Sequence, residues 1–480
     1  MSKIGVEIST TIRSGPVNDG PISGRFQMAA ITTTGPTDRA LLVRSIADYE
    51  ALYGARTSYS ATGYDTARLF FEEGGSELIV SRVVGPAAMK DVLKLVDGAA
   101  ADTLQISAVS PGSYNGALTA EVTTAGAGVN ITIRLDGEVM EILTGTTPAE
   151  LVSASAKSPL VNITDLGSVS EAPVNIPAVI AVTPLAGGSD DRASVTVEHV
   201  ISALALAGDL GEGGSVAAPG YPASVIGAQL IGYASANKRV AILAPAIETT
   251  ANDLILEADN YVSGAGDSAG LFYPHLVIPD GSGSRTISPE GYVAAVRARA
   301  HDQVGYWRKP FGDIAQLQWA IGTNVPVNTA LNNRLNDAKV NGIVTTGTKV
   351  RLYGWASLAT NPEMSAISDR DVLNNLGREL KNLLEPYVGE PIDGLGHLMG
   401  RVEGEVEGYV ANIADAGGLF ALVRDGDEID PGYQVTVNQS NNPLSSLAAN
   451  ILNVTVMIRL SPTADWIRVE IIKVPLQGAF

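Results

Sequence analysis

The period of hydrophobic and polar positions changes several times along the chain, and each period predicts a different kind of element. Strict alternation, typical of a strand with one buried face, occurs at Asn130–Leu135, Val139–Leu143 and Leu452–Leu460. In Asp371–Leu384 leucine recurs every three or four residues, which predicts an amphipathic helix that ends before Pro386. Both periods occur in one chain, so the sequence predicts a mixed α/β protein.

Strand-like and helix-like segments alternate in two long stretches. The first stretch begins with a buried strand at Met28–Thr33 and ends with another at Leu78–Val84. The second contains strands at Val240–Leu243 and Leu271–Ile278, followed by a helix with Ser288 as its N-cap. Such alternation predicts a mainly parallel, doubly wound sheet.

Residues 86–189, between these two stretches, are rich in Thr, Val, Gly and Ser. Leu118–Thr123 is strand-like, and Asp136-Gly137 is a strong hairpin signal between the two strands that flank it. The pattern predicts a small β domain inserted into the α/β layer.

The predicted fold class is α/β (α+β mixed) and multidomain, with five parts. They are an N-terminal arm (1–25), a discontinuous α/β core (26–85 and 190–345), the inserted β-rich domain (86–189), a C-terminal α/β domain (346–462) and a C-terminal arm (463–480).

The two arms carry the candidate site. Each contains the sequence I-x-V-E-I and has no hairpin partner next to it in the chain. Strand addition to the exposed sheet edge of a neighbouring subunit satisfies the backbone groups of such a segment. The residues predicted to make these inter-subunit links are Ile4, Val6 and Ile8 in the first arm and Ile467, Val469 and Ile471 in the second.

Charge and composition exclude several classes of function. The 480 residues include 32 Lys+Arg and 51 Asp+Glu, a formal net charge of −19 that disfavours binding to nucleic acid. The absence of Cys excludes disulfides and zinc-thiolate sites. The first ten residues do not resemble a signal peptide, and no stretch is apolar enough to span a membrane. The expectation is therefore a protein made in the cytoplasm that does not bind membranes.

Candidate catalytic motifs are weak. Gly266–Gly270 matches G-x-S-x-G, but the expected strand follows Ser268 instead of preceding it, so a linker is favoured over a nucleophile elbow. His301 has no second ligand at metal spacing, and a helix cap or surface position is expected for it. The loop Asp280–Arg285 is interpreted as a surface turn, with anion binding as the alternative. We therefore predict no enzyme activity, no cofactor and no metal.

Short motifs in the first half of the chain resemble those of the contractile tail sheath family. Ser45–Gly54 and Phe70–Val83 resemble the family's "S..dfe..fG" helix and "FF.nGG...yvvRv" segment. Ser110–Gly116 and Leu185–Asp190 are similar to its "G.wgN" turn and its "L.GG.dG" return to the core.

The most specific resemblance lies in the second half. Ser288–Pro310 is similar to "PpsG.vAG..Ar.D...Gvw.aPa", with Asp302 at the position of the Asp. Tyr353–Leu358 departs from the family's "vWGaRTl" because its Arg is absent, so any pairing made by that Arg is not expected here. In order and spacing the motifs cover nearly the whole chain.

The resemblance implies a structural subunit of a contractile sheath. Such subunits polymerise as stacked rings around an inner tube, and the sheath contracts to drive the tube through a cell envelope. The implied partners are further copies in a helical homo-oligomer, with six-fold rings as the expectation, and the tail tube, baseplate and tail terminator proteins. The implied location is a virion tail assembled in the host bacterial cytoplasm, and the parent particle is a phage, a bacteriocin or another injection system.

Two other classes of function remain as alternatives. A surface-layer or adhesin chain shares the Thr/Gly/Ala-rich composition without Cys, but it is expected to be mostly β and to carry an export signal. A hydrolase built on Ser268 is the other alternative, and the order of its strands argues against it.

Overall fold

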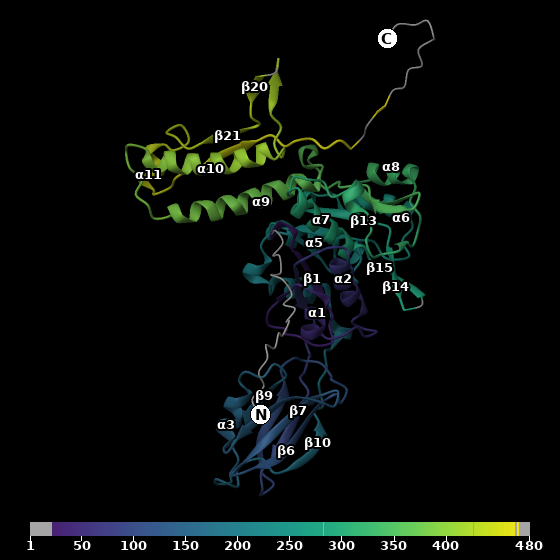
Figure 1. The fold of residues 1–480 in the computed structure, drawn as a ribbon, viewed down its shortest axis with the longest axis vertical. Coiled ribbons are helices and arrows are strands. Elements are labelled where there is room, and N and C mark those ends of the chain that lie inside the picture. The colour runs from purple at the N-terminus through teal and green to yellow at the C-terminus, as the bar shows by residue number, and fades with distance from the viewer. Residues whose placement is uncertain (1–21, 282, 426, 466–467, 470–480) are drawn as a thin grey trace, which may run out of the picture.

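Three units follow one another along the longest axis of the protein in the computed structural model, which describes residues 22–281, 283–425, 427–465 and 468–469. Figure 1 shows an α/β unit in the middle, a β-rich unit at one end and a helical unit at the other end. The mixed α/β fold class predicted from the sequence is confirmed.

The middle unit is built on an eight-stranded sheet in the order β18-β17-β13-β12-β11-β1-β3-β2. The six inner strands are parallel, and the two edge strands are antiparallel to their neighbours. The bounds are β1 (Phe26–Ala30), β2 (Leu41–Val43), β3 (Leu78–Arg82), β11 (Ser215–Ala217), β12 (Val240–Leu243), β13 (Ala269–Tyr273), β17 (Val340–Thr346) and β18 (Lys349–Leu352).

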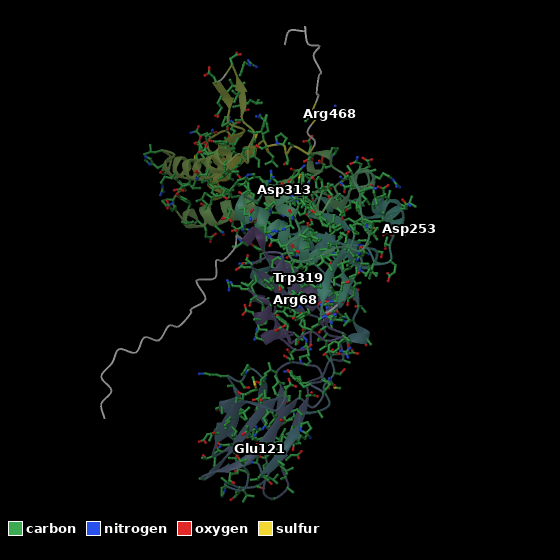
Figure 2. The ribbon with its side chains drawn as sticks, turned by 45° about the vertical axis from the view of Figure 1, so that its right-hand side comes forward. Arg68, Glu121, Asp253, Asp313, Trp319 and Arg468 are labelled. Atoms are coloured by element: carbon green, nitrogen blue, oxygen red, sulfur yellow. The ribbon has the colours of Figure 1, made fainter. Side chains whose placement is uncertain are left out.

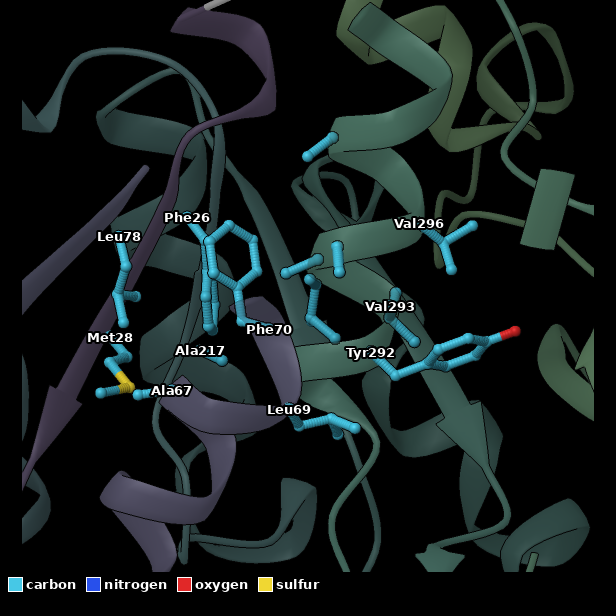
Figure 3. Packing of buried hydrophobic residues seen from close by; sticks show 14 of the residues in the cluster. Phe26, Met28, Ala67, Leu69, Phe70, Leu78, Ala217, Tyr292, Val293 and Val296 are labelled. Carbon is cyan, nitrogen blue, oxygen red and sulfur yellow. The ribbon is translucent and has the colours of Figure 1, made fainter. Parts of the chain in front are cut away.

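Helices cover both faces of this sheet, as the predicted doubly wound fold requires. Figure 3 shows one face, where Met28 and Leu78 of the strands pack against Phe70 of α2 and against α7. On the other face Ala29 and Val216 pack against α4 and α5. The bounds are α1 (Ile46–Tyr53), α2 (Ala61–Glu72), α4 (Val197–Ala205), α5 (Ala223–Ala236), α6 (Ala251–Glu257), α7 (Glu290–Gln303) and α8 (Thr329–Asp337).

Two contacts illustrate how polar side chains of this unit are held. Gln27, on the central strand β1, donates to the carbonyl of Leu204 at 2.8 Å. Figure 2 shows Arg68 of α2 beside Trp319, and the guanidinium carbon lies 4.9 Å from the ring centroid. The first contact joins β1 to α4 and satisfies a buried amide, which would be costly to leave without a partner.

One sequence prediction about this unit needs correction. The segment predicted as one strand at Leu271–Ile278 is two strands in different sheets, β13 and β14 (Leu276–Asp280), separated by Pro274. The segment Asp280–Arg285, interpreted as a surface turn, forms the turn end of a hairpin between β14 and β15 (Gly283–Ile287), and β16 (Gly322–Thr323) pairs with β14 on its other side. Proline has no N–H to donate and therefore interrupts the strand.

The β-rich unit consists of two small sheets that pack face to face around an apolar core. That core includes Leu104 and Ile106 from one sheet and Val122 and Ile131 from the other. The three-stranded sheet contains β4 (Val92–Val96), β5 (Asp102–Ala108) and β9 (Val161–Asp165). The four-stranded sheet contains β6 (Leu118–Ala125), β7 (Gly128–Leu135), β8 (Glu138–Gly145) and β10 (Ile180–Pro184), and α3 (Pro148–Ser155) covers one edge.

Two chain segments connect this unit to the middle one and pair with each other. The N–H of Met89 donates to the carbonyl of Ser189 at 2.7 Å, and the reverse bond is 2.9 Å. The carboxylate of Asp91, which is buried, accepts the N–H of Tyr114 at 2.7 Å and that of Gly188 at 2.6 Å. We call these paired segments (residues 85–92 and 186–191) the neck.

The third unit is mainly helical and is joined to the middle unit by one long helix. Helix α9 (Ile367–Leu384) begins among buried residues of the middle unit and extends outward, and α10 (His397–Asp415) lies beside it (Figure 1). The remaining elements are the hairpin β19 (Leu422–Arg424) and β20 (Asp427–Asp430), the pair β21 (Tyr433–Thr436) and β22 (Thr455–Ile458), and α11 (Leu444–Ala448). The predicted limit at residues 345/346 falls inside the β17–β18 hairpin of the large sheet.

Candidate inter-subunit interface

A two-stranded antiparallel sheet, β21–β22, covers one side of α10. Val435 lies opposite Val456, and Tyr433 lies opposite Ile458. These four side chains face the apolar side of α10, where Val410 is fully buried. Gln434 and Met457, also opposite each other, lie on the other face, and 53% of Met457 is exposed. The alternation of buried and exposed positions explains why this sequence pairs here.

The sheet is open at both outer edges within the described part of the chain. Each of the two strands has the other as its one ladder partner there. Two strands form only a marginal sheet in water, whereas three or more with an apolar face are stable. A further strand with alternating apolar residues therefore has a place to bind.

Asparagine side chains hold the two strands together at the end where the chain leaves β21. Asn442, which is buried, donates to the carbonyl of Asn453 at 2.9 Å and accepts its N–H at 2.6 Å. Asn441 donates to the carbonyl of Thr436 at 2.6 Å. The two strands are 18 residues apart in the sequence and are not joined by a tight turn. The asparagine hydrogen bonds therefore hold their ends together. These asparagines were not predicted from the sequence, although an Asn close to a strand end is a signal for side-chain hydrogen bonds to the backbone.

The chain is anchored where each predicted arm begins. Ser461 donates its N–H to the carbonyl of Gly418 at 3.1 Å, and Asp465 pairs with Lys309 at 2.7 Å. At the other arm, Arg25 pairs with the buried carboxylate of Glu77 at 2.6 Å. Both arms therefore start from fixed points on the folded subunit.

Five of the six predicted link residues lie outside the described part of the chain: Ile4, Val6, Ile8, Ile467 and Ile471. The sixth, Val469, is described, and 78% of its surface is exposed. The role of these six residues as inter-subunit links stays a prediction.

The position of Ser268 does not favour the hydrolase alternative. Ser268 closes a short 3₁₀ turn and precedes β13, and its buried hydroxyl hydrogen-bonds Asp267 at 3.1 Å. A nucleophile elbow instead follows a strand and presents its hydroxyl to solvent.

The position of His301 differs from the one predicted from the sequence. Its ring is fully buried, and Nε2 lies 3.6 Å from Asp371 of α9. The expected surface or cap position is wrong, because α7 is enclosed on all sides by the middle unit and by α9. Within the described ranges no group of three or more His, Asp or Glu side chains has the arrangement of a metal site.

A cavity of about 410 Å³ lies beyond the carboxyl ends of β11, β12 and β13, where doubly wound folds bind ligands. Among its charged groups, Asp65 receives hydrogen bonds from Arg56 at 3.0 Å and Arg285 at 2.9 Å, whereas Oε2 of the buried Glu290 has no hydrogen-bond partner among the described residues. Burial lowers the pKa of His275 to about 4 and raises the pKa of Glu290. No helix among the described residues is long and apolar enough to span a membrane.

The chain is similar in structure to proteins of contractile machines. A sheath tail protein from Listeria innocua is 12% identical, with a TM-score of 0.62, and the match covers 87% of this chain and 89% of that one. A sheath tail protein from Desulfitobacterium hafniense is 14% identical, with a TM-score of 0.59 and coverage of 90% and 93%. A chain from the contracted helical sheath of the anti-feeding prophage is 15% identical, with a TM-score of 0.56 and coverage of 99% and 100%.

Comparison of the sequence with family models finds no match, and comparison with curated proteins finds no similar sequence. At identities of 12–15% the likeness is one of fold, and it extends over nearly the whole chain. The resemblance seen in the sequence motifs is confirmed at that level: this chain has the fold of contractile sheath proteins.

Proposed function

We propose that this protein is the structural subunit of a contractile sheath. The observation that carries the proposal is the match of nearly the full chain to sheath proteins, among them one from a sheath in its contracted state. The subunits would polymerise around an inner tube and contract to drive it through a cell envelope. Six-fold rings, a tail tube, a baseplate and a terminator as partners, and assembly in a bacterial cytoplasm belong to the same proposal; a similar chain comes from a baseplate reconstructed with six-fold symmetry.

Strand exchange through the arms is the proposed link between subunits. The open edges of β21–β22 support it, since an added strand with the I-x-V-E-I pattern would place its apolar residues over α10, beside Val435 and Val456. We place the start of the unit that carries this receiving sheet at α9, later than the limit at residue 346, and keep the other predicted domain limits as part of the proposal.

Removal of residues 1–20 tests the proposal. The truncated chain should fold as a monomer and fail to polymerise, because the backbone link is lost while all described residues remain. Negative-stain electron microscopy of purified protein over several concentrations and salt levels measures this. A less drastic variant replaces Ile4, Val6 and Ile8 by Ser, with Glu7→Gln as the matched control.

Hollow striated cylinders from the full chain, and none from the truncated or triple-Ser chains, are the expected result. Normal cylinders from the truncated chain would contradict strand exchange but leave the sheath role intact. A flat crystalline array from the full chain would instead favour the surface-layer alternative.

A further inference from the structure

One buried ion pair joins three segments that are far apart in the sequence. Arg297 of α7 donates through Nε to a carboxylate oxygen of Asp371 of α9 at 3.2 Å, and through Nη2 to the other oxygen. Its remaining terminal nitrogen, Nη1, donates to the backbone carbonyl of Ser23. Ser23 lies in the 3₁₀ turn η1 (Ile22–Gly24), within the last residues of the predicted first arm (1–25).

The junction is closed to water. The side chains of Arg297 and Asp371 are each 1% exposed, and that of His301 is 0% exposed. Burial, followed by the charge of Arg297, lowers the pKa of His301, so the ring stays neutral and shields the pair. A guanidinium in such a place needs all its partners, because removing one leaves an uncompensated buried charge.

The turn η1 has little freedom to move away from α7. A Cβ atom on Gly24 would lie only 3.1 Å from the Cα of Ala298, one residue after Arg297. Arg25 then continues into β1. The backbone that leads out to the first arm is therefore held by close packing and by one guanidinium.

On its other side the same guanidinium holds the helix that supports the receiving sheet. Asp371 lies in the first turns of α9, and Leu380 near the end of that helix packs in the cluster that contains Val435 and Val456. Arg297 thus connects the start of the arm to the unit onto which, under the proposed function, a neighbour's arm adds.

We propose that Arg297 is a positioning residue for strand exchange, which fixes the direction of the first arm relative to the receiving sheet of the same subunit. This rests on the proposed function of the chain. Under that function, each subunit binds one neighbour through its arm, and another neighbour's arm binds to its β21–β22 sheet. A rigid connection between the arm and the sheet makes the geometry of one inter-subunit contact determine that of the next contact. A rotation of one subunit is then transmitted to its neighbours in the polymer.

Asp371→Asn tests the proposal with almost no change in shape. Arg297 loses its charge partner, and the guanidinium no longer holds Ser23 and α9 in one arrangement. Hydrogen exchange of the unassembled subunit should become at least ten times faster at residues 22–26 and in the first turns of α9, with exchange in β12 and β13 unchanged. Sheaths assembled from the variant should show a wider spread of axial repeat by electron microscopy.

The neighbouring ion pair on α9 provides the matched control. Arg370 pairs with Asp267, in a partly buried site that does not include Ser23. Asp267→Asn should leave exchange at residues 22–26 as in the unmodified chain. Equal acceleration by both variants, or no acceleration by Asp371→Asn, would overturn the positioning role.

Arg297→Lys covers the case in which Asp371→Asn does not fold. Lysine keeps the charge but has no planar fork to hold Ser23 and Asp371 together, so exchange at residues 22–26 should again be faster. Hydrogen exchange is measured on the unassembled subunit, whereas the axial repeat can be measured only on an assembled sheath. Failure of the positioning role is therefore distinguishable from failure of the sheath proposal.

Discussion

At the scale of residues, buried charges mark the places where distant segments meet. The carboxylate of Glu73, fully buried at the end of α2, accepts the N–H groups of Gln318, Trp319 and Ala320 at 2.8–2.9 Å. Asp91 accepts two N–H groups in the same way at the neck, and Arg297 donates to the carbonyl of Ser23 at the end of the first arm. Each would be costly alone, and each holds a loop whose own sequence does not determine its path.

His275 makes stability depend on pH. Its pKa is lowered by burial from 6.5 to about 4, so between these values the unfolded chain binds a proton that the folded chain does not. The stabilisation is complete above pH 6.5 and is lost as the pH falls towards 4. Going from pH 7 to pH 5 should cost about 2 kcal/mol through this residue.

Urea unfolding at pH 7 and pH 5 measures this effect. His275→Gln should reduce the loss of unfolding free energy between the two pH values by that amount. His397→Gln is the control, since 72% of its side chain is exposed in the folded chain. Equal pH dependence in the unmodified and His275→Gln chains would show that the folded protein already accommodates the charged ring.

At the scale of elements, the sequence predicted the helices and strands in which apolar residues recur with a regular period. The strand Val240–Leu243 and the hairpin at Asp136-Gly137 are confirmed. So are the strands that the sequence predicts at Tyr433–Asn438 and Leu452–Leu460, which form β21 and β22, although nothing local indicated that they pair across 18 intervening residues. The receiving sheet was thus visible only as two separate strands, and the asparagines that close it were not predicted.

Helix α10, 19 residues long, was not predicted at all. Gly400, Gly404 and Gly408 interrupt its sequence every fourth residue, and glycine is the poorest helix former after proline. Its apolar face, with Val402, Val406 and Val410 buried, stabilises the helix through packing instead. Tertiary contacts here outweigh local propensity.

Gly404→Ala should stabilise the monomer by about 0.5–1 kcal/mol, because a Cβ there meets nothing within 4 Å. Gly63→Ala, the same change in the first turn of α2, should destabilise it, since its Cβ would lie 2.6 Å from the Cβ of Ala30. Thermal unfolding of the two variants should shift in opposite directions. A loss of stability in Gly404→Ala would mean that the glycine has a role in the isolated subunit.

At the scale of the whole molecule, within the described part of the chain, the β-rich unit is attached through the neck and the contacts next to it. Arg82 donates to the carbonyl of Gly35 at 2.9 Å, and the N–H of Gly35 donates to Ser110 of the β-rich unit at 3.1 Å. The core of the β-rich unit shares no residue with those of the middle unit. Each unit therefore has the apolar interior that independent folding requires.

The neck gives a way to test this independence. Val92 and Ala186 exchange both of their backbone hydrogen bonds, at 2.9 and 3.0 Å, which is the pairing that a two-residue turn closes. Replacing residues 93–185 by Asn-Gly should leave a folded protein that retains the eight-stranded sheet, and residues 86–189 expressed alone should fold as a β protein. Calorimetry should then give two cooperative transitions, one for each piece, whose enthalpies sum to that of the full chain. If neither piece unfolds cooperatively, the two units stabilise each other across the neck, and the discontinuous core and its insertion are one folding unit.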